Sequence, residues 1–416
     1  MPTLRLLADF IKKYKHGKST LYLLCFVMLF WSLYEGVISY MTPLIISERG
    51  ISETLMGIII GSSSVAGALF DFIACRIFKN TYYKRMFLIM LAICLFYPLI
   101  LFKANTFILY ILAMAIWGVY FDLKNIGNFD FVGRQLKKSE HSEGFGLIQV
   151  FQSIGFLIAP ILVGFMIAEA FDYKSLILAW IFLIIAIFFF LVMYYFSPNR
   201  RQTESTAPKI KEKGLWLEIK TWKKLGRILL PVLILTLMLN FIDAFFWTVG
   251  PIFAEGMSEI RKFSGFFMTA YSLPALLVGW LVGSLTRRYG KKKTAFTSLG
   301  IGSLLLFMIY FLDNPILIIL TIFISSIFIS ISWPAINGAY ADYISESPDY
   351  EKEIESLEDF FTNLGYVLGP MVAGFIADRF GNSGAFSFIG LTGSLIAIFL
   401  LIFTPKKINI KRDLIS

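Results

Sequence analysis

The sequence contains few of the residues that build catalytic or metal centres. Of its 416 residues, 16% are charged, 3 are cysteine and 2 are histidine. The cysteines, Cys25, Cys75 and Cys94, lie in or beside apolar segments, where they are most simply small apolar core residues, so we expect no disulfide framework. His16 and His141 lie far apart in the sequence, and neither looks like a ligand. We therefore expect no metal site and no cofactor.

Apolar residues are abundant instead, at 57% of the chain with a mean hydropathy of +0.73. No soluble domain of this length could sustain such a composition, and the apolar runs are long enough to cross a bilayer. The sequence therefore predicts an all-α integral membrane protein with twelve transmembrane helices. The expected spans are 20–46, 54–77, 84–102, 105–133, 143–170, 174–196, 227–255, 263–286, 293–312, 314–343, 356–378 and 383–404.

Basic residues lie mostly on one side of these spans. With a cytoplasmic N-terminus, Lys and Arg gather in the cytoplasmic segments 5–18, 76–85, 134–138, 200–227, 287–293 and 406–412. This positive-inside pattern explains the net charge of +10, so we expect no nucleic-acid partner. It predicts a cytoplasmic (inner) membrane protein with both termini in the cytoplasm. We expect no cleavable signal peptide, because the first span is too long for the apolar region of one.

Two acids occupy equivalent positions in two halves of the chain. Glu35 lies near the middle of the first span, and Asp243 follows 208 residues later in the seventh. The same offset matches Ser32 with Asn240, and such gap-free agreement indicates an internal repeat. We expect a cytoplasmic amphipathic segment at 1–18, six-helix bundles at 19–198 and 227–404, a cytoplasmic linker with an interfacial helix at 199–226, and a cytoplasmic tail at 405–416.

The first, fourth, seventh and tenth spans hold the polar residues, whereas the interiors of the third, sixth, ninth and twelfth carry no charge. A mid-membrane charge costs roughly 2.5 to 3.5 kcal/mol on insertion scales, so these residues should face a cavity or a partner. We therefore expect two pseudo-symmetric bundles around a central cavity. Its candidate substrate and proton residues are Glu35, Asp243, Lys124, Asp122, Asn125, Asn128, Asn240, Trp31, Trp247, Trp333 and Asn337.

Glycine and proline recur in the second, fifth, eighth and eleventh spans. Small residues let helices approach closely, and an internal proline bends its helix, although ordinary membrane-helix packing is the alternative interpretation. Pro160 and Pro370 lie 210 residues apart, which repeats the pattern in both halves. The candidates for gating or helix packing in these spans are Gly67, Gly155, Pro160, Gly164, Gly365, Pro370 and Gly374.

Twelve spans in two halves, polar residues on every third helix and a long central loop resemble the major facilitator superfamily. Its loop signature, Gly-x-Leu-Ala-Asp-Arg-x-Gly-Arg-Lys, is matched after the eighth span by Gly283, Leu285, Arg288, Gly290, Lys291 and Lys292, with Arg287 at the aspartate position. Partial copies are Gly67, Leu69 and Asp71 after the second span, and Gly374, Asp378, Arg379 and Gly381 after the eleventh, on the external side.

The resemblance implies that these loop residues form gates. Asp71 should pair with a helix N-terminus or a basic loop residue, and Arg288 with an acid such as Asp342. The alternative is that the basic loop at 287–293 merely follows the topology rule. The fifth span, with Gly155, Pro160 and Gly164, also resembles the glycine–proline motif of antiporters in the superfamily.

Function follows from the resemblance and the charges together. The protein should be a secondary transporter that moves a small-molecule solute by alternating access, a monomer in the lipid bilayer, with protons as the coupling ion. A desolvated carboxyl group favours its protonated form, so Glu35 and Asp243 could bind and release protons, while Lys124 supplies the opposite charge. Alternatively, the acids form structural hydrogen bonds between helices, and Lys124 permanently neutralises Asp122 or Glu35.

Two other classes of membrane protein are alternatives to a transporter. A membrane-embedded enzyme, such as a lipid-group transferase, would need several His, Asp or Arg residues clustered near one surface, and the sequence has no such cluster, so we expect no enzymatic activity. A transporter-like sensor without flux would share all of the features above.

Overall fold

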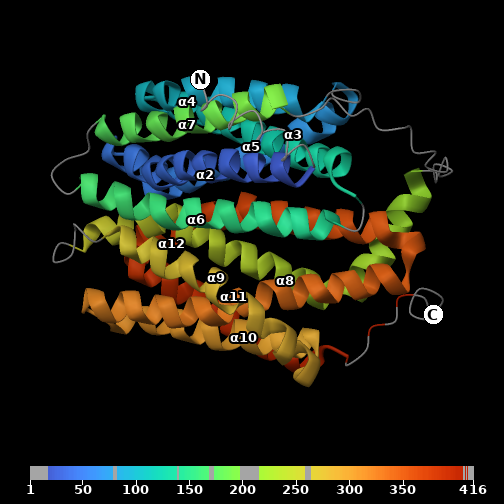
Figure 1. The fold of residues 1–416 in the computed structure, drawn as a ribbon. Helices are drawn as coiled ribbons and strands as arrows, with labels where there is room; N and C mark the ends of the chain where they lie inside the picture. The colour runs from blue at the N-terminus through green and yellow to red at the C-terminus, as the bar shows by residue number, and fades with distance from the viewer. Residues whose placement is uncertain are drawn as a thin grey trace. The chain divides into compact units, whose positions relative to one another are not determined.

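The computed structural model describes residues 17–77, 82–137, 140–167, 173–196, 215–257 and 264–405, together with 408 and 410. Within these ranges every regular element is a helix, which confirms the all-α prediction (Figure 1). The first six are α2 (Gly17–Glu48), α3 (Glu53–Ile77), α4 (Tyr83–Lys103), α5 (Phe107–Gln135), α6 (His141–Ile167) and α7 (Lys174–Phe196). They are followed by α8 (Leu215–Gly256), α9 (Gly265–Tyr289), α10 (Lys291–Phe307), the short η3 (Met308–Phe311), α11 (Pro315–Glu346), the short η4 (Pro348–Tyr350) and α12 (Glu351–Phe403).

The helices are long and apolar enough for a polytopic membrane protein. Of the described helices, 10 could each cross a membrane, and the broken helix α9 raises the number to 11. Helix α12 contains 53 residues and covers two expected spans. Gly381 divides it into two arms because its φ of 73° lies outside the helical region, in a conformation that glycine adopts without strain. The described helices thus account for each of the twelve expected spans.

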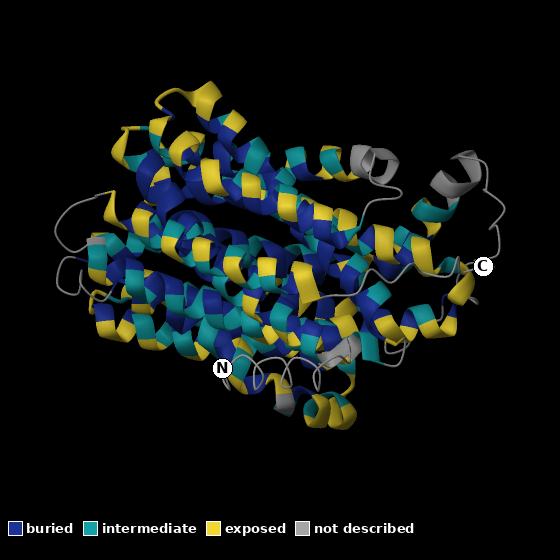
Figure 2. Ribbon diagram, turned by 45° about the horizontal axis from the view of Figure 1, so that its top comes forward, coloured by how far each residue is buried: buried dark blue, intermediate teal, exposed yellow. Residues whose placement is uncertain are grey.

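Helix α7 illustrates why these helices need a bilayer. Its buried side chains recur every three or four residues, as at Leu176, Ala179 and Leu183. Its other face exposes large apolar side chains, such as Ile184 at 59% and Phe188 at 61%. Figure 2 shows similar alternation of buried and exposed residues along the other helices. An apolar stripe of this length is stable against lipid rather than water.

The chain divides into two compact units. The first unit comprises Met1–Tyr40 and Ala66–Ala207, and the second comprises Met41–Val65 and Pro208–Ser416. The end of α2 and the start of α3 therefore group with the second unit, although the predicted N-terminal bundle, 19–198, includes them. The predicted domain boundaries stay a prediction.

Helix α8 differs from the expected linker. It runs from Leu215 to Gly256 without a break, so the predicted interfacial helix continues directly into the seventh span. The rest of the predicted linker, 199–214, lies outside the described residues, as do nearly all of the amphipathic segment at 1–18 and most of the tail at 405–416.

Candidate functional site

Glu35 is fully buried on α2, in the first unit. Its Oε1 atom accepts a hydrogen bond from the Trp117 indole N–H and a longer one, of 3.4 Å, from the Ser39 hydroxyl one turn along α2. Its Oε2 atom accepts a 2.8 Å bond from the Tyr120 hydroxyl. Trp117 and Tyr120 belong to α5, where a spacing of three residues places them on one face. Donors from two helices therefore hold the carboxyl group.

Aromatic side chains of α4 and α2 lie close to Tyr120. The Tyr97 ring packs edge-on against the Tyr120 ring, with 5.2 Å between the centroids. Tyr34 is buried beside them and donates a 2.9 Å bond to the backbone carbonyl of Cys94. This aromatic packing shields the carboxyl group of Glu35 from water and fixes the direction of its donors.

Lys124 lies one turn after Tyr120 on α5 and is only 6% exposed. Its ammonium group lies 4.0 Å from the Phe121 ring centroid and 5.2 Å from the Trp31 ring centroid, so cation–π contacts partly replace its lost hydration. None of the ion pairs in the described part of the chain involves Lys124. It still interacts electrostatically, at longer range, with the carboxyl groups of Glu35 and Asp122.

Asp122, another polar candidate of α5, lies beside α3. The Asp122 carboxylate packs against Gly67, so that a β-carbon added there would meet one of its oxygens. Asn125 and Asp71 both lie near Asp122, and the charge of Asp71 acts on it. Asn128 is buried, and its Oδ1 atom has no hydrogen-bond partner within the described ranges. The structure thus brings two predicted gate residues, Gly67 and Asp71, next to a predicted cavity residue.

Asp243 lies on α8 in the second unit, and two tyrosines bind it. Its Oδ1 atom accepts a 2.6 Å bond from the Tyr271 hydroxyl of α9, and its Oδ2 atom accepts a 2.8 Å bond from the Tyr366 hydroxyl of α12. The Tyr271 ring stacks on Phe246 at 3.8 Å, which holds its hydroxyl in place. Asp243 therefore has hydrogen-bond donors on two neighbouring helices, as Glu35 has donors on α5.

Asn240 lies one turn before Asp243 and is buried. Its side-chain amide donates to the Thr236 carbonyl at 2.8 Å and to the Thr362 hydroxyl at 3.4 Å. Trp247 is half-buried one turn after Asp243, which extends the predicted stripe of α8. The candidates of α11 are more open, because Trp333 is half-buried and Asn337 is exposed.

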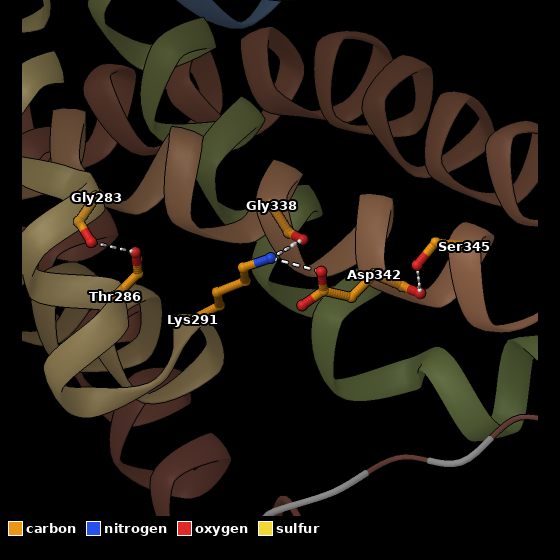
Figure 3. A network of polar contacts seen from close by, with 6 residues as sticks. All are labelled: Gly283, Thr286, Lys291, Gly338, Asp342 and Ser345. Carbon is orange, nitrogen blue, oxygen red and sulfur yellow. Dashed lines mark hydrogen bonds and ion pairs between the residues drawn. The ribbon is translucent and has the colours of Figure 1, made fainter.

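Lys291, rather than Arg288, pairs with Asp342. The Lys291 ammonium lies 2.6 Å from Oδ1 of Asp342 and donates a 2.9 Å bond to the Gly338 carbonyl (Figure 3). The predicted pairing of Arg288 with Asp342 is therefore wrong. The guanidinium of Arg288 lies instead over the ring of Tyr289, 5.2 Å from its centroid.

The turn between α9 and α10 explains this exchange of partners. Gly290 has a φ of 86°, which ends α9 and starts α10 within one residue. Arg287 and Arg288 stay exposed in the last turn of α9, whereas Lys291 begins α10, which packs beside α11. A match to the loop signature does not determine which of its basic residues lies next to the acid.

The glycines of the fifth and eleventh spans pack in the same way within each unit. A β-carbon at Gly155 of α6 would lie 2.7 Å from Cβ of Ser32 on α2, and one at Gly365 of α12 would lie 2.5 Å from Cβ of Asn240 on α8. Ser32 and Asn240 are the pair that the internal repeat matches. Gly164, Pro160 and Pro370 are also buried along these two helices, whereas Gly374 lies against the start of α3.

The sequence identifies both acids but not the side chains that donate hydrogen bonds to them. Trp117, Tyr120, Tyr271 and Tyr366 donate to them, and none is a predicted site residue. A signal existed in the fourth span, because Trp117 and Tyr120 share a helix face with Lys124. Tyr271 and Tyr366 lie in the eighth and eleventh spans, which the sequence marked for packing alone.

The described residues define a polytopic helical membrane protein with an internal repeat and a hydrogen-bonded carboxyl group in each copy. The family model for the Major Facilitator Superfamily matches residues 22–349 and 239–413. The chain belongs to this superfamily. It is a membrane transporter, so the predicted family and fold class are confirmed, as is the prediction that the protein is not an enzyme.

Solved structures share the fold over nearly the whole chain. The nucleoside transporter NupG is 14% identical, with 93% of this chain and 100% of that chain covered at a TM-score of 0.74. The peptide transporter POT in complex with sulfate is 14% identical, with 95% of each chain covered at a TM-score of 0.71. A bacterial homologue of the human lysosomal transporter Spinster, inward-facing and unoccupied, is 13% identical, with 93% and 95% covered at a TM-score of 0.64. A comparison with curated proteins finds no match.

Proposed function

We propose that this transporter moves a small solute by alternating access, driven by protons that bind to Glu35 and Asp243. Alternating access exposes a bound solute first to one side of the membrane and then to the other. The internal repeat supports the proposal because each copy places one acid in an equivalent span. Both acids accept hydrogen bonds from hydroxyl groups, and a hydroxyl can form a hydrogen bond with either the ionised or the protonated acid.

The hydroxyl groups around the acids are the observation that carries this proposal. Asp243 accepts hydrogen bonds from two tyrosine hydroxyls, and Glu35 accepts from one tyrosine hydroxyl and one serine hydroxyl. A hydroxyl can donate or accept, so it can donate to a carboxylate and accept from a carboxylic acid. A buried polar group without a partner costs about 1–3 kcal/mol, and rotation of a hydroxyl avoids that cost when the proton arrives.

The partners of Glu35 also indicate which oxygen takes the proton. The Trp117 indole can only donate, so it favours an Oε1 that has no hydrogen. Tyr120 can turn its hydroxyl and accept from a protonated Oε2. We therefore assign the proton to Oε2, on the side of Tyr120.

Lys124 is the third charge of the mechanism. Its ammonium group interacts electrostatically with Glu35 and Asp122, which favours the ionised form of each carboxyl group. When Glu35 binds a proton, Lys124 loses one of these two interactions and becomes a better partner for an acceptor group of the solute. Proton binding and solute binding would then be coupled through one side chain.

The direction of coupling that we propose is antiport. Support comes from the glycine and proline residues of α6, Gly155, Pro160 and Gly164, which resemble the antiporter motif of the superfamily. Gly155 packs so closely on α2 that the backbone around Ser32 leaves no room for a side chain. A close contact of this kind supports a rigid α2–α6 pair that moves as one piece.

The test begins with finding the solute. Since solved structures of the same fold include a nucleoside transporter and a peptide transporter, nucleosides and short peptides are the first compounds for a thermal-shift screen. A compound that binds the folded protein raises its melting temperature. Uptake of that compound into proteoliposomes is then measured with and without a pH gradient.

Glu35→Gln and Asp243→Asn should each abolish uptake that depends on the pH gradient. Asp313→Asn is the matched control, because Asp313 is exposed between η3 and α11 and should leave uptake unchanged. Normal gradient-driven uptake by both acid variants would contradict the proposal. Binding without flux under any gradient would instead identify a transporter-like sensor.

A further inference from the structure

The first arm of α12 ends in a carboxylate that caps α3. Asp378 accepts hydrogen bonds from the backbone N–H groups of Glu53 and Thr54, at 2.9 Å and 2.8 Å, and from the Thr54 hydroxyl at 2.5 Å. The first N–H groups of a helix lack partners within the helix and lie at its positive end, so a carboxylate is a strong acceptor there. Asp378 belongs to the copy of the loop signature that follows the eleventh span.

The cap is not needed to form α3, because the helix has a cap of its own. The Ser52 hydroxyl accepts a 3.3 Å bond from the Leu55 N–H, and the Ser52 carbonyl accepts a 2.9 Å bond from the Met56 N–H. Asp378 approaches the same end from 325 residues away in the sequence. Its bonds therefore hold two helices together rather than one helix in shape.

Glycines bring the two helices into backbone contact along this line. A β-carbon at Gly57 would overlap the carbonyl of Pro370, and one at Gly374 would overlap the carbonyl of Glu53. Gly61 repeats the contact one turn further, against the carbonyl of Val367. This packing explains why residues 41–65 group with the second unit. In the predicted bundles, however, α3 belongs to 19–198 and α12 to 227–404, so the contact links parts that alternating access must separate.

We propose that Asp378 is a positioning residue of the transport cycle: it holds the start of α3 against α12 and favours the conformation closed to the external side. The inference rests on the proposed alternating access and on the predicted topology, which puts the loop before Glu53 outside. Glu53 lies close enough to Asp378 for their like charges to repel. When Glu53 is ionised, that repulsion opposes the capping bonds, so the contact can open again during each cycle.

The test measures access to the site from outside and needs no solute. A reporter, Ser39→Cys, is placed beside Glu35 in the full-length chain after the three natural cysteines have been replaced by serine. The protein stays in the membrane of whole cells, and a membrane-impermeant maleimide labels the reporter. Asp378→Asn keeps the shape of the side chain but removes its charge, so labelling from outside should become several-fold faster.

Asp313→Asn is the matched control, because it removes the charge of an exposed acid between η3 and α11 that takes no part in the α3–α12 contact. It should leave the labelling rate unchanged. An Asp378→Asn rate equal to that of the parent would overturn the inference, as would an equal acceleration by the control variant. Melting temperatures of all variants show whether each one remains folded.

A reversible lock gives a second, independent result. Thr54→Cys combined with Asp378→Cys places two thiols where a hydrogen bond of 2.5 Å now joins the side chains. Oxidation should slow labelling of the reporter below the parent rate, and reduction should restore it. An oxidised pair that labels at the parent rate would contradict a role in closure.

The outcomes separate this inference from the proposed function. If the reporter is labelled but neither change at Asp378 alters its labelling rate, the inference is contradicted. Proton coupling through Glu35 and Asp243 is not affected by that result. A reporter that reacts from neither side, even in permeabilised cells, contradicts alternating access at Glu35, and the inference falls with it.

Discussion

At the residue scale, the two acids differ in how many other helices donate hydrogen bonds to them. Glu35 is bonded to side chains of α2 and α5, whereas Asp243 is bonded to tyrosines of α9 and α12. Protonation of Asp243 therefore changes hydrogen bonds that join α8 to two other helices. Such a change can shift the balance between two arrangements of those helices, because packed interfaces between helices switch between discrete arrangements and do not deform continuously.

Removing one tyrosine hydroxyl at Asp243 should destabilise the protein in a pH-dependent way. Tyr366→Phe or Tyr271→Phe deletes a bond to the carboxylate, and a lost partner of this kind costs about 1–3 kcal/mol. A bond donated to the charged carboxylate is stronger than a bond shared with the neutral acid, so its stabilisation is largest at alkaline pH and weakens as the pH falls and Asp243 takes up a proton. Melting temperatures of the purified variants should therefore fall further below the parent at alkaline than at acid pH.

Tyr340→Phe provides the control for that measurement. The Tyr340 hydroxyl shares a 3.0 Å bond with the hydroxyl of Thr236, and neither group changes charge near neutral pH. Its loss should lower the melting temperature by the same amount at both pH values. The account of Asp243 fails if Tyr271→Phe and Tyr366→Phe also lower the melting temperature by the same amount at both pH values.

The sequence predicts the acids better than their partners for a physical reason. A carboxyl group in the middle of a span is costly, so Glu35 and Asp243 can be found from composition alone. Tyrosine and tryptophan carry no such cost, and the chain has 19 of one and 8 of the other. Which of them reach an acid depends on how helices pair, and that information is not local. The wrong pairing of Arg288 with Asp342 has the same origin.

At the scale of the element, the mirrored glycine contacts set how closely α6 and α12 approach their neighbours. Gly155→Val and Gly365→Val should each destabilise the protein by about 1–3 kcal/mol, because an added side chain in a packed contact forces the backbones apart. At both positions the nearest atoms belong to another helix. The measurement is the thermal or denaturant stability of each purified variant.

Gly146 offers a matched position in the same helix as Gly155. A β-carbon at Gly146 would meet no atom within 4 Å, so Gly146→Val should leave stability nearly unchanged. Equal losses at Gly146 and Gly155 would contradict a close α2–α6 contact. Loss at Gly155 without loss at Gly365 would contradict the mirrored packing of the two copies.

Helix positions follow from the sequence because a span needs about 20 apolar residues, which no other feature of the chain imitates. Helix ends are harder to predict. Helix α8 extends through the expected linker to Leu215, and the two arms of α12 meet at Gly381 without an intervening loop. Neither feature affects apolar burial, so hydropathy has no means of detecting it.

At the scale of the whole molecule, the internal repeat places the same arrangement of functional groups in both halves of the chain. Each copy places a carboxyl group on its first helix and a close glycine contact against that helix. The capping contact of Asp378 is an additional feature of the second unit that we assign to one conformation of the cycle. Proton binding by the two acids is the step on which the rest of the proposed mechanism depends.

Infrared spectroscopy tests that step most directly, because a protonated carboxyl group has a C=O band that a carboxylate lacks. Spectra of the purified protein are recorded as the pH is raised, with Glu35→Gln and Asp243→Asn measured beside the parent. The account predicts a carboxylic acid band that disappears on titration and that loses one distinct component in each variant. A band that both substitutions leave unchanged would show that neither acid carries a proton.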